Sequence, residues 1–239
     1  MKRFATIATV GATVCALSLA AAVPAMADTT STTPPPKLNG TSSLAAIQAA
    51  GATQTANRIT SLNSGIAKLT AKPTLTSSDK ATILATLNAD LQGMDSLQAK
   101  IAADTTAATA LADYRSIYTV WRVYAVGLRQ SYIAASADGL TGTAIPRLQS
   151  AATKLAAALA AKPSKITPAL QEQLADMNAK IADASTKTNG LAAAALAVTP
   201  ADFNANHSVL ETPHANAEAA RADTKAAAID GRAILAALR

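Results

Sequence analysis

The side chains with the greatest capacity for binding chemistry lie between residues 114 and 132, where aromatic rings alternate with arginines. The chain has 1 Trp and 4 Tyr, and all of them fall in this stretch. On a regular helix, alternating spacings of four and three residues put one set on a single face: Tyr114, Tyr118, Trp121, Ala125, Leu128 and Tyr132. Arginines follow beside this face at intervals of seven residues: Arg115, Arg122 and Arg129.

Two interpretations of this aromatic face follow. In the first, the rings are the core contacts of a central helix, and the guanidinium groups are solvated or paired with nearby carboxylates. In the second, Tyr114, Tyr118 and Trp121 with Arg115, Arg122 and Arg129 form a surface for a ring-bearing, anionic or lipidic partner, held by stacking and cation–π contacts. Helical spacing in the middle of the chain favours the core interpretation.

A second constellation comprises His207, Glu211 and His214, which would share one face of an unbroken helix. Nitrogen and carboxylate ligands can hold zinc, and Glu-x-x-His occurs in carboxylate-bridged di-metal bundles. Those bundles use the motif twice, however, and Pro213 interrupts the spacing here. We therefore predict solvated histidines, with no metal and no cofactor.

Motifs of the common enzyme classes are missing from the sequence. It contains no G-x-S-x-G elbow, H-E-x-x-H helix, glycine-rich phosphate loop or calcium loop. A recognisable nucleic-acid module is missing too, and Lys and Arg do not form a tight cluster. We expect a non-catalytic protein that does not bind nucleic acid.

The first 27 residues have the pattern of a secretory signal peptide. Lys2 and Arg3 precede an apolar run, and Ala25 and Ala27 occupy the small-residue positions of a peptidase site. Cleavage after Ala27 would remove the single cysteine, Cys15, and would lower the formal charge from +6 to +4. We therefore expect a secreted protein, extracellular or wall-associated, with no disulfide and no transmembrane segment in the mature chain.

The rest of the sequence predicts an all-α fold. Residues 28–40 form a Thr/Pro-rich linker, and residues 41–239 form an alanine-rich domain that should fold as an elongated antiparallel bundle of five to six helices. Caps, prolines and apolar spacing place the expected helices at 43–71, from 76, 106–137, 143–161, 167–198 and from 199, with a restart or kink at Pro213.

Two boundaries follow from weaker signals. Residues 104–106 mark a break, although one helix running from 76 to about 137 is the alternative. Two glycines within residues 138–142 indicate a loop.

An Ala-Lys-Pro sequence recurs at 71–73 and 161–163, each followed by Ala-Lys-Ile-Ala. This echo fits either a duplicated hairpin or chance in a sequence of low diversity.

The Ala-Met-Ala end of the signal, the Thr/Pro linker and the stretch AKIAADTTAATALADYRSIYTVWRVY resemble a group of secreted alanine-rich helical proteins of actinobacteria. The resemblance implies an extracellular or wall-associated all-α protein. It assigns no activity and no functional residues.

The leading functional hypothesis is a secreted, non-catalytic binding or scaffolding protein of the cell envelope or medium. Its partner would be a cell-wall polymer, a lipid or another envelope protein. The alternative is a carrier of an apolar or aromatic small molecule between helices lined by Tyr114, Tyr118 and Trp121. An extracytoplasmic enzyme without a recognisable motif is the third hypothesis.

Overall fold

The computed structural model describes residues 37–239. The predicted signal peptide, with its cleavage residues Ala25 and Ala27, and most of the predicted 28–40 linker lie outside the described residues. Within 37–239 every regular element is helical, which confirms the all-α prediction.

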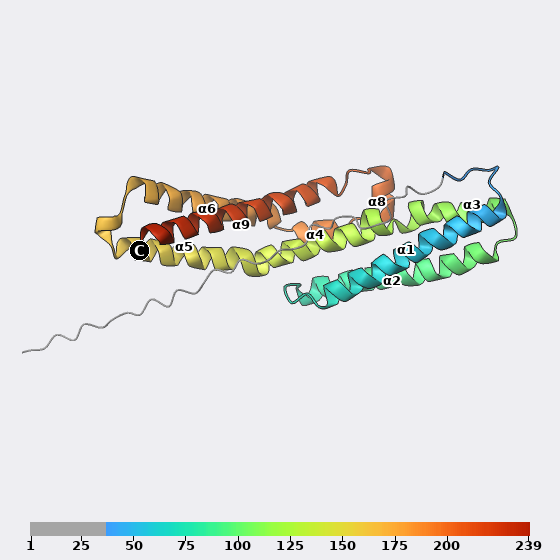
Figure 1. Ribbon diagram of the computed structural model, residues 1–239, viewed down its shortest axis with the longest axis horizontal. Helices are drawn as coiled ribbons and strands as arrows, with labels where there is room; N and C mark the ends of the chain where they lie inside the picture. The colour runs from blue at the N-terminus through green and yellow to red at the C-terminus, as the bar shows by residue number, and fades with distance from the viewer. Residues whose placement is uncertain (1–36) are drawn as a thin grey trace, which may run out of the picture.

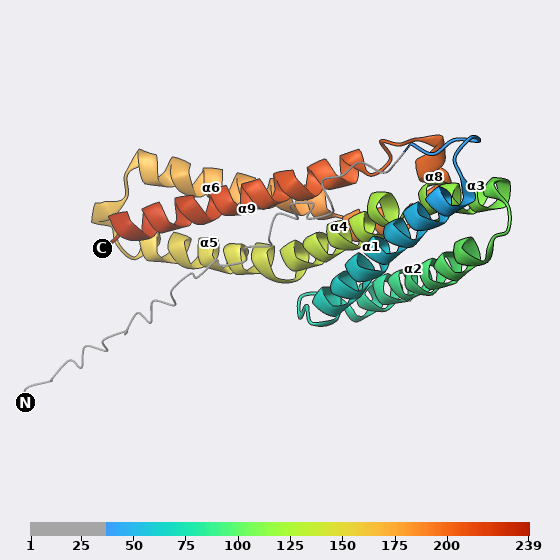
Figure 2. The same cartoon turned by 45° about the vertical axis from the view of Figure 1, so that its right-hand side comes forward.

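The helices form two three-helix bundles placed end to end, where the sequence had suggested one bundle (Figure 1). The first contains α1 (Leu44–Thr70), α2 (Ser77–Ala103) and α3 (Ala107–Ser116) with the segment that follows α3. The second contains α5 (Ile145–Ala160), α6 (Pro168–Thr188) and α9 (Glu211–Ala237). Both views show an elongated molecule with the two bundles at opposite ends (Figures 1 and 2).

A helical segment from Ala107 to Ala160, interrupted at Arg122, belongs to both bundles. After α3 it contains two π-helical turns, η1 (Ile117–Trp121) and η2 (Val123–Gly127), then α4 (Leu128–Gly139), a third π-helical turn η3 (Leu140–Ala144), and α5. The loop predicted at 138–142 is therefore wrong. Each glycine costs a helix only about 1 kcal/mol, and burial of Leu140 and Ile145 favours continuation of the helix.

Local capping explains most helix boundaries, because a side-chain oxygen satisfies one free amide of the first turn. The predicted caps accept these bonds at Ser43, Thr76, Thr106, Thr167 and Thr199. Residues 104–106 separate α2 from α3, so the predicted break is confirmed. The restart near Pro213 is also confirmed, because α9 begins at Glu211 with Pro213 in its first turn.

The predicted single helix over 167–198 is wrong in its second half. α6 ends at Thr188, and Gly190 adopts a φ of 66°, which favours glycine because it has no β-carbon. Short elements follow: α7 (Leu191–Leu196) and α8 (Pro200–Ala205). The turn between α5 and α6 contains a 3₁₀ turn, η4 (Pro163–Lys165).

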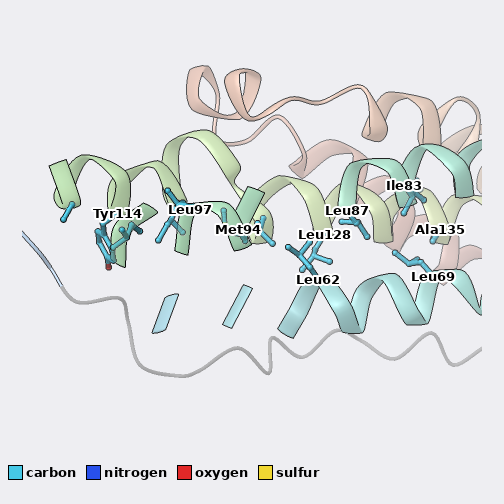
Figure 3. Packing of buried hydrophobic residues seen from close by; sticks show 14 of the residues in the cluster. Leu62, Leu69, Ile83, Leu87, Met94, Leu97, Tyr114, Leu128 and Ala135 are labelled. Carbon is cyan, nitrogen blue, oxygen red and sulfur yellow. The ribbon is translucent and has the colours of Figure 1, made fainter. Parts of the chain in front are cut away.

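Three buried clusters correspond to this architecture. Leu62, Leu87 and Met94 lie in the core of the first bundle, which Figure 3 shows from close by. Met177 and Ile181 belong to the core of the second bundle. A third cluster joins α4 to α7 and the start of α9, with members Ile133, Ala137, Leu191, Ala195, Leu210 and Ala217.

α4 lies between the two bundles, and four of its polar side chains are buried: Gln130, Ser131, Ser136 and Asp138. The Gln130 amide, with its nitrogen turned toward α7, donates to the carbonyl oxygens of Val198 at 2.8 Å and Ala195 at 3.2 Å. Ser136 accepts from Nη2 of Arg221 at 2.8 Å, and Asp138 accepts from the Thr76 amide at 2.8 Å. These bonds tie the α1–α2 turn, α7 and α9 to the shared segment, because a buried polar group without a partner is costly.

The two Ala-Lys-Pro sequences close corresponding helices, α1 and α5. Ala71 donates to Ala67 and Ala161 to Ala157, while Lys72 donates to Leu69 and Lys162 to Leu159. The echo therefore marks the first hairpin turn of each bundle.

No helix within residues 37–239 combines the length and apolar character needed to cross a bilayer.

Candidate functional site

The predicted aromatic face lies where α1, α2 and the central segment meet. Tyr114 is buried, and Tyr118 and Trp121 are half-buried and pack against the core of the first bundle. The uniform helix predicted over 106–137, with Tyr114, Tyr118, Trp121 and Tyr132 on one face, is wrong, because π-helical turns and the left-handed Arg122 interrupt it. The two π-helical turns alter the rotation per residue, so Trp121 contacts α2 while Tyr118 and Tyr124 face α1.

Arg58 of α1 organises these rings, and the sequence analysis did not identify it. The side chain is 6 % exposed, and its guanidinium carbon lies 4.9 Å from the ring centroid of Tyr118 and 4.8 Å from that of Tyr124. Its Nη1 donates to the main-chain and side-chain oxygens of Gln54, each at 2.9 Å. None of the described residues accepts a hydrogen bond from its Nε.

The electrostatics of this cluster reflect a cation buried among phenols. Desolvation lowers the pKa of Arg58, and the neighbouring Tyr118, Tyr124 and Tyr114 oppose that effect. Burial raises the pKa of Tyr118, and its hydrogen bond with Tyr114 adds to the increase. The two phenol oxygens lie 3.2 Å apart, and Tyr124 forms a 3.1 Å hydrogen bond with Ser61. The cluster is thus a cation–π core in which the Arg58 guanidinium lies against the rings of Tyr118 and Tyr124.

Arg122 occupies the joint between the two π-helical turns. Its φ of 46° makes it the non-glycine residue with a left-handed backbone within 37–239. Nε of Arg122 donates to Oδ1 of Asn204 at 2.9 Å, and Nδ2 of Asn204 donates to the carbonyl of Thr119 at 2.6 Å. The guanidinium also lies 5.1 Å from the ring centroid of Phe203. α8 therefore holds this strained residue in place, since such a conformation persists only where the surroundings fix it.

The other two predicted arginines lie apart from this cluster. Arg115 is exposed on α3. Arg129 forms a 2.9 Å ion pair with Glu211, and this pair lowers the pKa of Glu211. The three arginines that the sequence placed along one edge therefore have three different environments.

The His207, Glu211 and His214 trio does not come together as a ligand set. His207 precedes α9 and its ring lies 5.1 Å from that of Phe203, while Glu211 pairs with Arg129. Within residues 37–239, no three His, Cys, Asp or Glu side chains are grouped closely enough to hold a metal ion.

Close packing of α2 against the central segment depends on two glycines. The Trp121 ring occupies the space that a β-carbon at Gly93 would need, and the Asp90 carboxylate does the same at Gly127. Burial in this contact raises the pKa of Asp90 to about 6. One edge of the half-buried Trp121 ring thus packs against Gly93, and the side chain is otherwise partly exposed.

A search for relatives found no matching family model, no matching curated protein and no matching solved structure. Function must therefore be argued from the geometry of the chain itself.

Proposed function

We propose that this chain is a secreted, non-catalytic binding or scaffolding protein of the cell envelope or medium. The observation that carries the proposal is the helical segment Ala107–Ala160, which is interrupted at Arg122 and is shared by both bundles. At a rise of 1.5 Å per residue this segment is about 80 Å long. The proposed export rests on the signal pattern of residues 1–27.

A shared helix suits a scaffold because it fixes the separation of two binding faces. Bundles joined by a flexible linker would move independently, whereas here α4 is buried between them and bonded to both through Ser136 and Asp138. Long, exposed helix sides on two bundles provide surface area for a partner. This architecture supports binding to an extended envelope component.

The carrier alternative receives less support from the aromatic cluster. A carrier would need Tyr114, Tyr118 and Trp121 to line a space for an apolar ligand. Arg58 fills the space beside Tyr118, and Trp121 is packed against Gly93. The rings therefore contact side chains of the protein itself, which favours the structural interpretation of this face.

Retention on cell envelopes tests the proposal. Mature protein, residues 28–239, is incubated with isolated envelopes of the host and sedimented, with an unrelated soluble helical protein of equal charge as the control. We expect saturable retention of the mature chain. If retention is no greater than that of the control and a small apolar molecule co-purifies in stoichiometric amount, the carrier hypothesis would replace the scaffold proposal.

A further inference from the structure

The charges of α9 are sorted between its two sides. Asp223 and Asp230, seven residues apart, face α6, where they pair with Lys187 at 2.6 Å and Lys180 at 2.8 Å. Hydrogen bonds to Asp176 and Asp230 raise the pKa of Lys180, and the hydrogen bond to Asp223 raises the pKa of Lys187. From Asp223 to its C-terminal end, α9 therefore directs its acidic side chains toward α6.

Other basic side chains lie on a different side of α9. Lys225 and Arg232 follow the acidic series by two positions, which turns them by about 200° around the helix, and Arg239 continues the seven-residue spacing just beyond the end of α9. All three are exposed, and none forms an ion pair among residues 37–239. They border the side on which α5 packs, because α6 occupies the opposite flank.

α5 adds cations along the same border. It contains no acidic residue, and its Arg147 and Lys154 are exposed and lie seven residues apart. On a regular helix Lys154 lies about 100° around the axis from Leu155, which faces Gly231 of α9. α5 and α9 run in the same direction and meet near Leu155 and Gly231, and Nζ of Lys162 donates to the carbonyl of Leu238 at 2.8 Å. We call the exposed series the basic ladder: Arg147, Lys154, Lys225, Arg232 and Arg239.

An apolar side chain lies within the ladder. Ile229 is 50 % exposed, one of two large hydrophobic side chains so exposed within residues 37–239. On α9 it is the neighbour of Lys225 at four residues and of Arg232 at three. It provides a contact for the non-ionic part of a bound molecule.

We infer that the basic ladder of α5 and α9 binds an extended, phosphate-bearing polymer of the cell envelope. This inference rests on the proposed binding function and names its partner. Successive rungs on one helix are about 10 Å apart along the axis, so the cations follow a line and do not converge on one point. A chain of anionic groups matches that line, whereas a single small anion would meet one cation at a time.

The side-chain chemistry favours phosphate groups. Arginine presents a planar fork that donates two parallel hydrogen bonds to phosphate oxygens, and lysine adds a compact charge. Unpaired cations along one border also raise the local potential, which attracts polyanions and makes binding salt-dependent. A membrane surface fits less well, because Ile229 is the single large apolar side chain exposed beside the ladder.

Two triple variants of the full mature chain test the ladder at equal net charge. The ladder variant carries Lys154→Gln, Lys225→Gln and Arg232→Gln. The control variant carries Lys37→Gln, Lys68→Gln and Arg115→Gln, which are exposed cations of the linker end and first bundle. Circular dichroism and melting temperature of both should match the unmodified chain, because exposed charges contribute little to stability.

Binding is measured by fluorescence anisotropy with labelled polyphosphate of about 20 units. We expect the ladder variant to lose tenfold or more in affinity and to show a shallower dependence on salt, while the control loses less than twofold. Equal losses in the two variants would mean that net charge alone acts, and would overturn the inference.

Three further probes separate other occupants. Tighter binding of polyglutamate than of polyphosphate would exclude specificity for phosphate. Displacement of the labelled polyphosphate by inorganic phosphate at low concentration would show a site for a single small anion. Stronger binding to phosphatidylglycerol vesicles would identify a membrane surface instead. The envelope assay distinguishes the two proposals. If envelopes retain the ladder variant as well as the unmodified chain, the inference about the basic ladder is contradicted and the proposed function is not. If the chain binds polyphosphate but envelopes do not retain it, the proposed function is contradicted.

Discussion

The indole ring of Trp121 lies on Gly93 of α2, in the space that a β-carbon at position 93 would occupy. Replacement by Ala should therefore force the ring or the helix to move. We expect Gly93→Ala to lower the free energy of unfolding by about 1 to 3 kcal/mol, as overpacking does elsewhere. Denaturant titration of the mature chain measures the change.

Gly142 is the matched control, because a β-carbon there would meet nothing within 4 Å. Gly142→Ala should leave stability unchanged or raise it by up to about 1 kcal/mol, since alanine restricts the unfolded chain. A Gly93→Ala variant as stable as Gly142→Ala would show that the ring does not pack there.

Arg58 should tolerate loss of its charge better than replacement by another cation. Arg58→Lys keeps a buried charge but loses the planar group that stacks between Tyr118 and Tyr124, so we expect a loss of about 1 to 3 kcal/mol. Arg58→Met keeps the bulk and removes the desolvation cost, so its loss should be smaller. Equilibrium unfolding ranks the two variants. A larger loss for Arg58→Met would contradict this order and would show that the attraction between the cation and the rings outweighs its desolvation cost.

The burial of individual core side chains predicts how much stability each one loses when it is replaced by Ala. Leu87 and Ile181 are buried in the first and second cores, so each change to Ala should cost about 2 to 5 kcal/mol. Leu91, four residues after Leu87 on α2, is half-buried, and Leu91→Ala should cost less. If thermal or denaturant unfolding showed that Leu91→Ala lowers stability more than Leu87→Ala, the assignment of helix faces would be contradicted.

Asp90 should make stability depend on pH. Its pKa rises from 3.8 to about 6 in the folded state, so the folded chain retains a proton that the unfolded chain has lost between those values. Stability from this group is therefore present at low pH and is lost as pH rises from about 4 to about 6. The carboxyl is half-buried, so solvent screening reduces the expected effect to about 1 kcal/mol.

Asp90→Asn should accordingly stabilise the protein at pH 7 and have little effect at pH 4. Asp95→Asn, an exposed carboxyl one turn further along α2, is the control and should change neither value. A stabilisation of equal size at both pH values would show that the titration of Asp90 is not its cause.

The sequence revealed the parts of this fold that are determined locally. Thr76, Thr106, Thr167 and Thr199 bond to amides three residues away, so their caps are visible in a short window. Continuation through Gly139 and Gly142 depends on burial from both bundles, which no local window contains. Two glycines without that context indicate a loop.

The aromatic site was predicted only in part, for a similar reason. The rings of Tyr114, Tyr118 and Trp121 are concentrated enough to be noticed, but Arg58 lies 60 residues before Tyr118 and carries no motif. The left-handed Arg122 is stabilised by Asn204 and Phe203 of α8, again from a distant segment. Pairing between helices remote in the chain leaves no periodic signal.

The most direct test of the account is whether the helical segment 107–160, held by α8 where Arg122 interrupts it, joins the two bundles rigidly. Residues 28–239 contain no cysteine, so Ala112→Cys on α3 and Thr153→Cys on α5 can be labelled cleanly with a donor and an acceptor dye in this part of the chain. The account predicts a single narrow distance of about 60 Å by single-molecule energy transfer, from the helical rise over the intervening residues. A broad distribution, or a population with the labels close together, would contradict the shared rod.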